Sequence, residues 1–202
     1  MKKLITLLLV LVTLNGYSQS KEVIEYHEEV ANHGEISKSV GLRFYKEDVK
    51  IFVDGKVDEY LKIELDNIIK ELNELIDPIN IYYVDNKQES NMDIYFGDME
   101  SFMKIYNLEY DREFIEHNWG AFWIYPKGTT IILSKVFIDT ERTNSDISRK
   151  HLLREEVTQA LGLRNDSYKY SDSMFYAKWK NITAYSNLDK EIIKYHYNVV
   201  YD

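Results

Sequence analysis

The sequence predicts a single α+β domain built on a mixed sheet. Its 202 residues hold several short β-type runs between two long runs with helical spacing, which favours helices packed on a sheet. Apolar residues make up 45% and charged residues 29%, so collagen-like, coiled-coil and wholly disordered chains are excluded. No repeat or linker indicates a second domain. We expect one domain over residues 46–202, preceded by a signal peptide over 1–18 and an N-terminal arm over 19–45.

The first 18 residues have the three parts of a secretory signal peptide. Lys2 and Lys3 form a basic start, residues 4–14 are almost all apolar, and small residues stand at Gly16 and Ser18. This pattern predicts an exported protein, periplasmic or extracellular, that is soluble after cleavage. The apolar run is shorter than the roughly 20 residues that a bilayer demands, and no later run is long enough, so we expect no membrane span.

Composition excludes several classes of function. The formal net charge is −9, and loss of the two signal-peptide lysines makes it −11. Such an acidic protein is a poor general binder of nucleic acid, because phosphate contacts need clustered Lys and Arg. The chain has no cysteine, which excludes disulfides, thiolate zinc sites and cysteine nucleophiles.

The first half of the chain predicts a strand followed by a long helix. Residues 21–39 are polar with scattered apolar side chains, and we expect a loose arm or an early strand there. Apolar residues at every second position over 49–53 predict a strand that ends in the turn at 54–55. Over residues 57–76 they recur at spacings of three and four, which predicts an amphipathic helix that stops at Asp77-Pro78.

The middle of the chain is typical of β-structure. Residues 79–84 and 92–97 have the composition of strands, and Asp98 is placed to cap a short helix. Residues 119–125 and 129–136 predict a hairpin joined by a Pro-Lys-Gly turn.

Two helices close the predicted fold. One begins near Ser145 and ends at Gly162, since glycine is a common helix terminator. Residues 165–181 show no regular spacing. Ser186 then caps a final helix, with Asp189 three residues on in the manner of a capping box.

The informative stretch is Glu-Glu-Val-Thr-Gln-Ala-Leu-Gly-Leu-Arg-Asn-Asp over residues 155–166. At about 100° per residue, Glu155 and Gln159 share one line of the helix and Glu156 lies beside it. A solvent face that carries two glutamates and a glutamine is commonplace, so the pattern alone predicts no site.

In its spacing the stretch resembles the active-site helix of the metzincin zinc peptidases, especially the matrixin-like group. That helix carries HExxHxxGxxH, with three histidine ligands and a glutamate base. The resemblance puts Glu155, Gln159 and Asn165 at the three ligand positions, Glu156 at the base and Gly162 at the glycine. All three ligand positions are changed, so the resemblance implies a zincin-like fold with a degenerate active-site helix.

Two later segments resemble the same group and lie in the expected order. Residues 172–176, which include Met174 and Tyr176, resemble the Met-turn, where a methionine lies beneath the metal. Residues 186–197 resemble the closing helix, and the order of strand, long helix, two strands and hairpin also fits. The chain resembles even more closely a bacterial family of exported proteins of unknown function, through residues 155–163, Asn165-Asp166 and 172–176.

The chemistry of this constellation leaves more than one interpretation open. The amides of Gln159 and Asn165 are poor zinc donors, so we expect no zinc and no other cofactor. Arginines or lysines nearby would neutralise Glu155 and Glu156 as ordinary ion pairs, although a carboxylate pair in a cleft also provides acid–base chemistry. His151 stands four residues before Glu155, as the start of a ligand set or as a partly exposed helix residue.

The predicted hairpin suggests a second kind of site. In metzincin-like folds the edge strand above the active-site helix pairs with an extended peptide, and main-chain pairing survives the loss of catalysis. Trp119, Phe122, Trp123 and Tyr125 would then line the cleft. Alternatively, these aromatic residues alternate into the core, which is the more ordinary arrangement.

The sequence therefore favours a non-catalytic or repurposed cleft that binds an extended peptide or a cell-envelope component. The alternative is a divergent hydrolase that uses Glu156 as general base with an unusual metal or none, and a purely structural envelope role is the third possibility. The remaining candidate cleft residues are Glu155, Gln159, Asn165, Asp166, Met174 and Tyr176.

Overall fold

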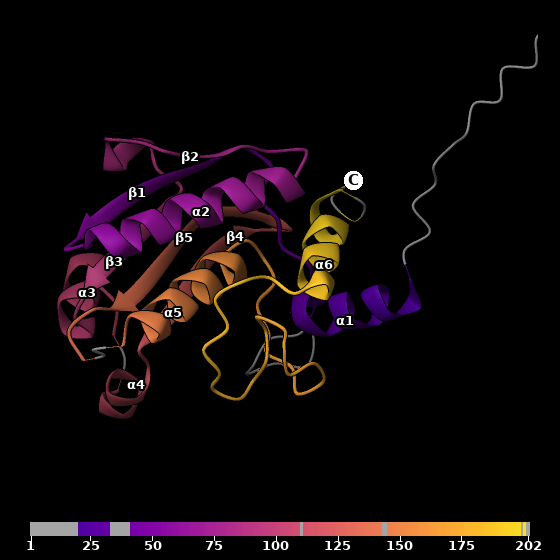
Figure 1. The fold of residues 1–202 in the computed structure, drawn as a ribbon. Helices are drawn as coiled ribbons and strands as arrows, with labels where there is room; N and C mark the ends of the chain where they lie inside the picture. The colour runs from indigo at the N-terminus through magenta and orange to yellow at the C-terminus, as the bar shows by residue number, and fades with distance from the viewer. Residues whose placement is uncertain (1–19, 33–40, 110, 143–144, 199, 201–202) are drawn as a thin grey trace, which may run out of the picture.

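The computed structural model describes residues 20–32, 41–109, 111–142, 145–198 and 200, so the predicted signal peptide lies outside the described residues. The fold is a mixed α/β fold around a five-stranded sheet with the order β2-β1-β3-β5-β4 (Figure 1). Its strands are β1 (Val49–Gly55), β2 (Ile81–Tyr83), β3 (Met92–Gly97), β4 (Gly120–Lys127) and β5 (Thr130–Asp139). Neighbouring strands are parallel except for β4 and β5, which form the predicted antiparallel hairpin. The expected mixed sheet is confirmed.

The helices follow the predicted order with two additions, α1 and α4. They are α1 (Lys21–Asn32), α2 (Glu59–Leu75), α3 (Met99–Tyr106), α4 (Arg112–His117), α5 (Asp146–Gln159) and α6 (Asn187–Asn198), besides a 3-10 turn at Lys87–Glu89. The side chains of Asp58, Asp98 and Ser145 cap α2, α3 and α5 by accepting a main-chain N–H. Helix α4 was not predicted, because six residues show too little periodicity to recognise.

The sheet separates two apolar clusters. Ile94 and Phe96 of β3 face the main cluster, which α2 and α5 cover, whereas Tyr95 faces a smaller cluster around α3. The same alternation sends Phe137 of β5 to the α3 side. Helices α2 and α5 lie side by side across one face of the sheet (Figure 1). The central strands are therefore buried on both faces.

The loose arm or early strand expected over residues 21–39 is wrong for its described part. Residues 21–32 form helix α1, which packs against α6 (Figure 1). Val23, Tyr26 and Val30 are buried in the main cluster. Their spacings of three and four are helical, but only three large apolar residues carry the pattern. Packing against α6 supplies the stabilisation that the local sequence lacks.

A long irregular loop joins α5 to α6, as expected, and carries an isolated bridge between Ser167 and Tyr176. Ser186 and Asp189 form the predicted capping box: the Ser186 hydroxyl accepts from Asp189 N, and the Asp189 carboxylate accepts from Ser186 N. Among the helices of the described residues, none is long and apolar enough to cross a membrane.

Candidate functional site

Helix α5 carries a row of polar side chains at intervals of four residues. His151 Nε2 lies 3.3 Å from Glu155 Oε2, and Gln159 Nε2 donates to Asp166 Oδ1 over 2.8 Å. The Glu155 side chain is 13% exposed, and Gln159 is buried. Neither side chain points into bulk solvent, so the commonplace solvent face considered from the sequence is not what the fold contains.

His151 is buried, not partly exposed as one interpretation of the sequence held. Its Nδ1 lies 2.9 Å from the Ile182 carbonyl oxygen, which can only accept, so Nδ1 carries a proton. Burial lowers the pKa of the imidazole, and the bond to Ile182 opposes this shift. The bond ties the loop before α6 to the start of α5.

The neighbouring cations mostly turn to other partners. Arg154 donates to Glu64 over 2.7 Å and to Glu71 over 2.6 Å, both on α2. Lys150 pairs with Glu64 at 3.0 Å. The expectation that Arg154 and Lys150 neutralise the α5 glutamates is therefore wrong, because their side chains point to α2, about 100° and about 140° around the helix from Glu155.

The turn after α5 depends on Gly162 and separates the predicted ligand positions. Gly162 has φ +116°, and a Cβ there would lie 2.0 Å from the Arg43 carbonyl oxygen. Beyond it, Asn165 turns to α1: its backbone N–H donates to Val30 O over 3.0 Å and its amide to Glu29 O over 3.2 Å. Asn165 is thus engaged by α1, whereas Asp166 is joined to Gln159.

The segment that resembles a Met-turn is pinned to the start of α6. Met174 is fully buried, and its N–H donates to the Asp189 carboxylate over 3.0 Å. Ser173 donates to the same carboxylate over 2.5 Å and accepts from the Tyr26 hydroxyl over 2.7 Å. Burial raises the pKa of Asp189, and these hydrogen bonds oppose the shift. Tyr176 is half-buried and lies under the Lys180 ammonium group, 5.3 Å from its ring centre.

Glu156 lies directly beneath the edge strand. A Cβ placed on Gly120 of β4 would be 2.7 Å from Glu156 Oε1 and 2.9 Å from Leu152. Glu156 is buried, and the glycine at position 120 leaves room for its side chain beneath the strand. The predicted general base is therefore held where α5 and β4 meet.

A cavity of about 430 Å³ opens at the same meeting point. Trp119 and Trp179 form two of its walls, with ring centroids 5.9 Å apart and exposed fractions of 40% and 53%. Trp179 also packs edge-on against His151 at 5.4 Å. The other lining residues are His117, Asn118, Gly120 and Leu152.

The aromatic residues of the hairpin divide between the two expected arrangements. Phe122 packs on the main cluster and Trp123 on the α3 cluster, where its ring lies 5.1 Å from Phe102. Tyr125 is 38% exposed and lies beside Lys135. Of the four, Trp119 alone lines the cavity, because Phe122 and Trp123 follow the strand's alternation into the two cores.

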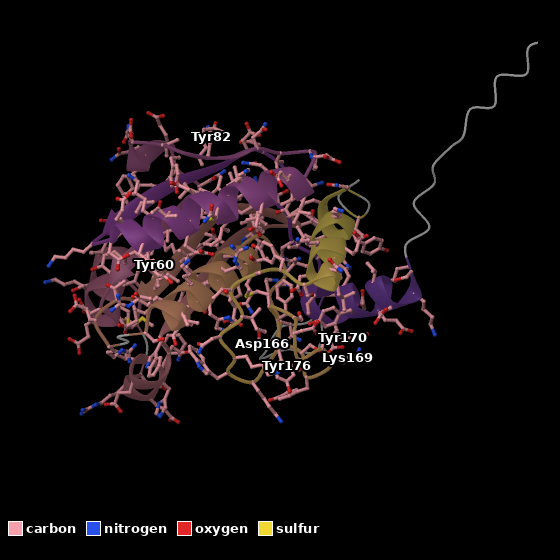
Figure 2. The ribbon with its side chains drawn as sticks, in the orientation of Figure 1. Tyr60, Tyr82, Asp166, Lys169, Tyr170 and Tyr176 are labelled. Atoms are coloured by element: carbon pink, nitrogen blue, oxygen red, sulfur yellow. The ribbon has the colours of Figure 1, made fainter. Side chains whose placement is uncertain are left out.

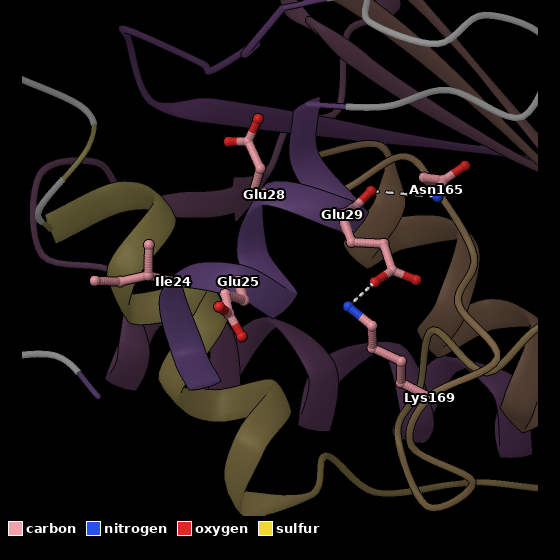
Figure 3. A pocket seen from close by; sticks show the side chains of 6 residues that line it. All are labelled: Ile24, Glu25, Glu28, Glu29, Asn165 and Lys169. Carbon is pink, nitrogen blue, oxygen red and sulfur yellow. Dashed lines mark hydrogen bonds and ion pairs between the residues drawn. The ribbon is translucent and has the colours of Figure 1, made fainter. Parts of the chain in front are cut away.

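A second cavity of about 670 Å³ lies between α1 and the loop after α5. Figure 3 shows Lys169 paired with Glu29 there, and Asn165 bonded to the Glu29 carbonyl. Asp166, Lys169, Tyr170 and Tyr176 all come from this loop and lie below α6 in the view of Figure 2. The remaining lining residues are Ile24, Glu25 and Glu28.

The donor set does not fit a zinc ion. The Gln159 amide is bonded to Asp166 and the Asn165 amide to Glu29 O, and neither is a histidine. Within the residues that the structure describes, no group of three or more His, Asp or Glu side chains is arranged so that it could hold a metal ion.

Sequence reasoning missed Trp179 and the structural role of Asp189. Trp179 lies in a loop without periodicity, and a lone tryptophan there carries no signal. The capping pattern identified Asp189 as a helix cap, but its bonds to Ser173 and Met174 are tertiary.

No curated protein sequence matches the chain. Two solved structures of myroilysin are similar to it, with TM-scores of 0.44 and 0.45 at 11% and 9% sequence identity. The matches cover 73% and 76% of this chain and 92% and 84% of those chains. Residues 20–199 match the family described as "Protein of unknown function (DUF2927)". A family of unknown function was expected, and the chain belongs to this one.

Proposed function

We propose that the protein is an exported, zincin-like binding module whose cleft receives an extended peptide without cleaving it. The edge strand β4 carries the proposal. It pairs with β5 on one side only within the described residues, and the cavity between Trp119 and Trp179 lies at its first residue. A free strand edge offers main-chain hydrogen bonds, and an adjoining apolar cavity offers side-chain selection.

Gln159 at the end of α5 and Asn165 in the loop after it support binding over catalysis. Gln159 and Asn165 stand where the zincin resemblance requires histidines, and both amides are engaged in bonds that shape the loop. Both amides therefore hold the loop after α5 in place, which supports a role in structure over a role in binding a metal. The ligand is a peptide or another envelope component with an exposed extended segment.

A displayed library of random dodecapeptides, selected on the immobilised full chain, provides the probe. We expect selected synthetic peptides to bind the native protein, and Trp179→Ala to weaken them by about tenfold or more, since buried aromatic anchors dominate such interfaces. Tyr168→Ala is the matched control, because Tyr168 is 71% exposed and does not line the cavity. Equal affinity in all three proteins would contradict the assignment of the cleft.

One observation favours the alternative of a divergent hydrolase. The Glu156 carboxylate is buried against Gly120, where a base beside a bound peptide would stand. Incubation of the selected peptides with the native protein, followed by mass spectrometry and by elemental analysis of the protein, tests it. Cleavage that Glu156→Gln abolishes would establish the hydrolase, whereas intact peptides with retained binding support the binding module.

A further inference from the structure

Two buried histidines outside the cleft form a hydrogen-bonded chain between three segments. His27 of α1 and His196 of α6 meet with Nε2 and Nδ1 2.9 Å apart. His196 Nε2 continues the chain to the Arg43 carbonyl oxygen over 3.0 Å. His27 is 3% exposed and His196 is fully buried. No part of the proposed cleft uses this pair.

The carbonyl oxygen that ends this series of hydrogen bonds determines which ring nitrogens carry protons. A carbonyl oxygen only accepts, so His196 Nε2 carries a proton, and the neutral His196 accepts at Nδ1 from His27 Nε2. Two protonated rings would place two donors face to face. A single charge on His196 would be fully buried and close to the positive charge of Arg164. The closed arrangement therefore requires a neutral His196 and, because His27 is also buried, favours a neutral His27.

The charged groups around the pair agree with this requirement. Burial and His27 lower the pKa of His196, and Arg164 lowers it further, while its bond to Arg43 O opposes the shift. Burial lowers the pKa of His27 to about 4, and Glu28 on the same helix opposes that shift. The other neighbours are aromatic: Tyr195 packs on His27, and Phe44 and Tyr197 pack on His196.

The pair holds α1 where α1 supports the turn after α5. The carbonyls of Glu29 and Val30 accept from Asn165, and Gly162 lies against both Arg43 O and the His196 ring. Opening of α1 would remove these acceptors from the turn that leads to Asp166. The pair is therefore linked through main-chain contacts to the side of α5 that borders the cleft.

We propose that His27 and His196 form an acid-sensitive latch, which holds α1 on α6 while both imidazoles are neutral and releases α1 when they take up protons. The inference is independent of what the cleft binds. Release requires no unfolding of the sheet, because α1 joins the fold through α6 and the loop and contributes no strand.

Linkage sets the size and direction of the effect. A histidine whose pKa is lowered in the closed state favours that state at pH values above its ordinary pKa of about 6.5. This stabilisation is lost as the pH falls toward 4. When the pH falls from 7.5 to 5.5, protonation of two imidazoles that are free in the open state raises the ratio of open to closed α1 about 100-fold. Protonation of one raises it about tenfold.

Hydrogen–deuterium exchange of the full chain at these two pH values, corrected for the intrinsic exchange rates, measures this ratio. We expect about a 100-fold rise in opening for α1 amides of the native protein and about a tenfold rise in His27→Gln, whose amide still donates to His196 but does not titrate. His117→Gln, which removes an exposed histidine, should show the native rise.

The same data contain the outcomes that would overturn the latch. Opening of α1 that does not change with pH, or that rises equally in native protein and His27→Gln, contradicts it. An equal rise in α1, α5 and β3 would mean that the pair titrates only when the whole chain unfolds, which also contradicts it. Should His27→Gln fail to fold, histidine side-chain NMR of the native protein decides: titration of His196 near 6.5 with α1 still protected overturns the proposal.

Discussion

Helix α5 meets two different environments, one toward α2 and one toward β4 and the loop. On the α2 side Arg154 is 2% exposed and forms short bonds to Glu64 and Glu71, while Tyr185 covers its guanidinium at 4.7 Å. On the other side the longer His151–Glu155 contact lies next to an open cavity walled by half-exposed tryptophans. Both sides are polar, but only one is closed.

The difference separates residues that hold the helix from residues available to a ligand. Buried ion pairs tolerate little change, because loss of one partner leaves an uncompensated charge in a dry environment. Side chains at the edge of a cavity have room to move, so their substitution disturbs the fold less. We therefore expect substitutions on the two sides of α5 to differ in their cost, with the largest loss of stability at the turn where the helix ends.

Gly162→Ala should cost the most, about 5 kcal/mol of unfolding free energy, because the added Cβ meets a backbone oxygen at a positive φ. The clash with Arg43 O at 2.0 Å has no flexible side chain to absorb it. Urea unfolding followed by circular dichroism measures the loss. A change below about 1 kcal/mol would mean that the turn readily adopts another path.

Arg154→Met should destabilise the fold by about 3 kcal/mol, since Glu64 loses its buried partner. Glu64 is itself buried, with Lys150 as its other cation. The double variant with Glu64→Met is the matched control and should recover most of the loss, because replacing a whole buried pair by apolar side chains is often neutral. Equal losses in the single and double variants would contradict this account of the closed side.

Gln159→Glu tests the cleft side of α5. It should lower the free energy of unfolding by about 2 kcal/mol at pH 7, because it places a second carboxylate against Asp166. Burial and Asp166 raise the pKa of the introduced carboxyl, so the loss should diminish as the pH falls and that carboxyl is protonated. Thermal unfolding at pH 7 and pH 5 measures it, relative to the native protein at each pH. Gln159→Leu removes the hydrogen bond without adding a charge, and its loss should not depend on pH in this way.

Periodicity predicted most of the elements because their stabilisation is local or amphipathic. The long helix α2, the hairpin and the capping box of α6 each have their pattern within a few residues. Helix α1 was missed because its apolar stripe is narrow and its stability comes from α6. The local sequence could not predict that Asn165 contacts α1 while Asp166 accepts from Gln159, because the α1 partner of Asn165 lies 136 residues away.

The two sides of α5 show more clearly why the sequence alone does not predict side-chain partners. Arg154, Glu155 and Glu156 are adjacent in sequence, so ion pairs among neighbours were a reasonable expectation. Helical geometry sends Arg154 to α2 and Glu156 to Gly120, and only the packing of other elements decides which of them ends in a closed environment. The position of the cleft also depends on Trp179, which no pattern identified.

Gly120→Ala should lower the free energy of unfolding least, by about 1 kcal/mol, and it gives the sharpest contrast with Gly162→Ala. The added Cβ would meet Glu156 and Leu152, whose side chains can move, and position 120 has no positive φ. Glu156 must shift toward the cavity, so the emission of Trp119 and Trp179 should change while the thermal unfolding midpoint falls by only about 2–4 °C. A loss as large as that of Gly162→Ala would show that the β4 side of α5 is packed as rigidly as the turn after the helix. That result would contradict the division of the helix into a structural side and a ligand side.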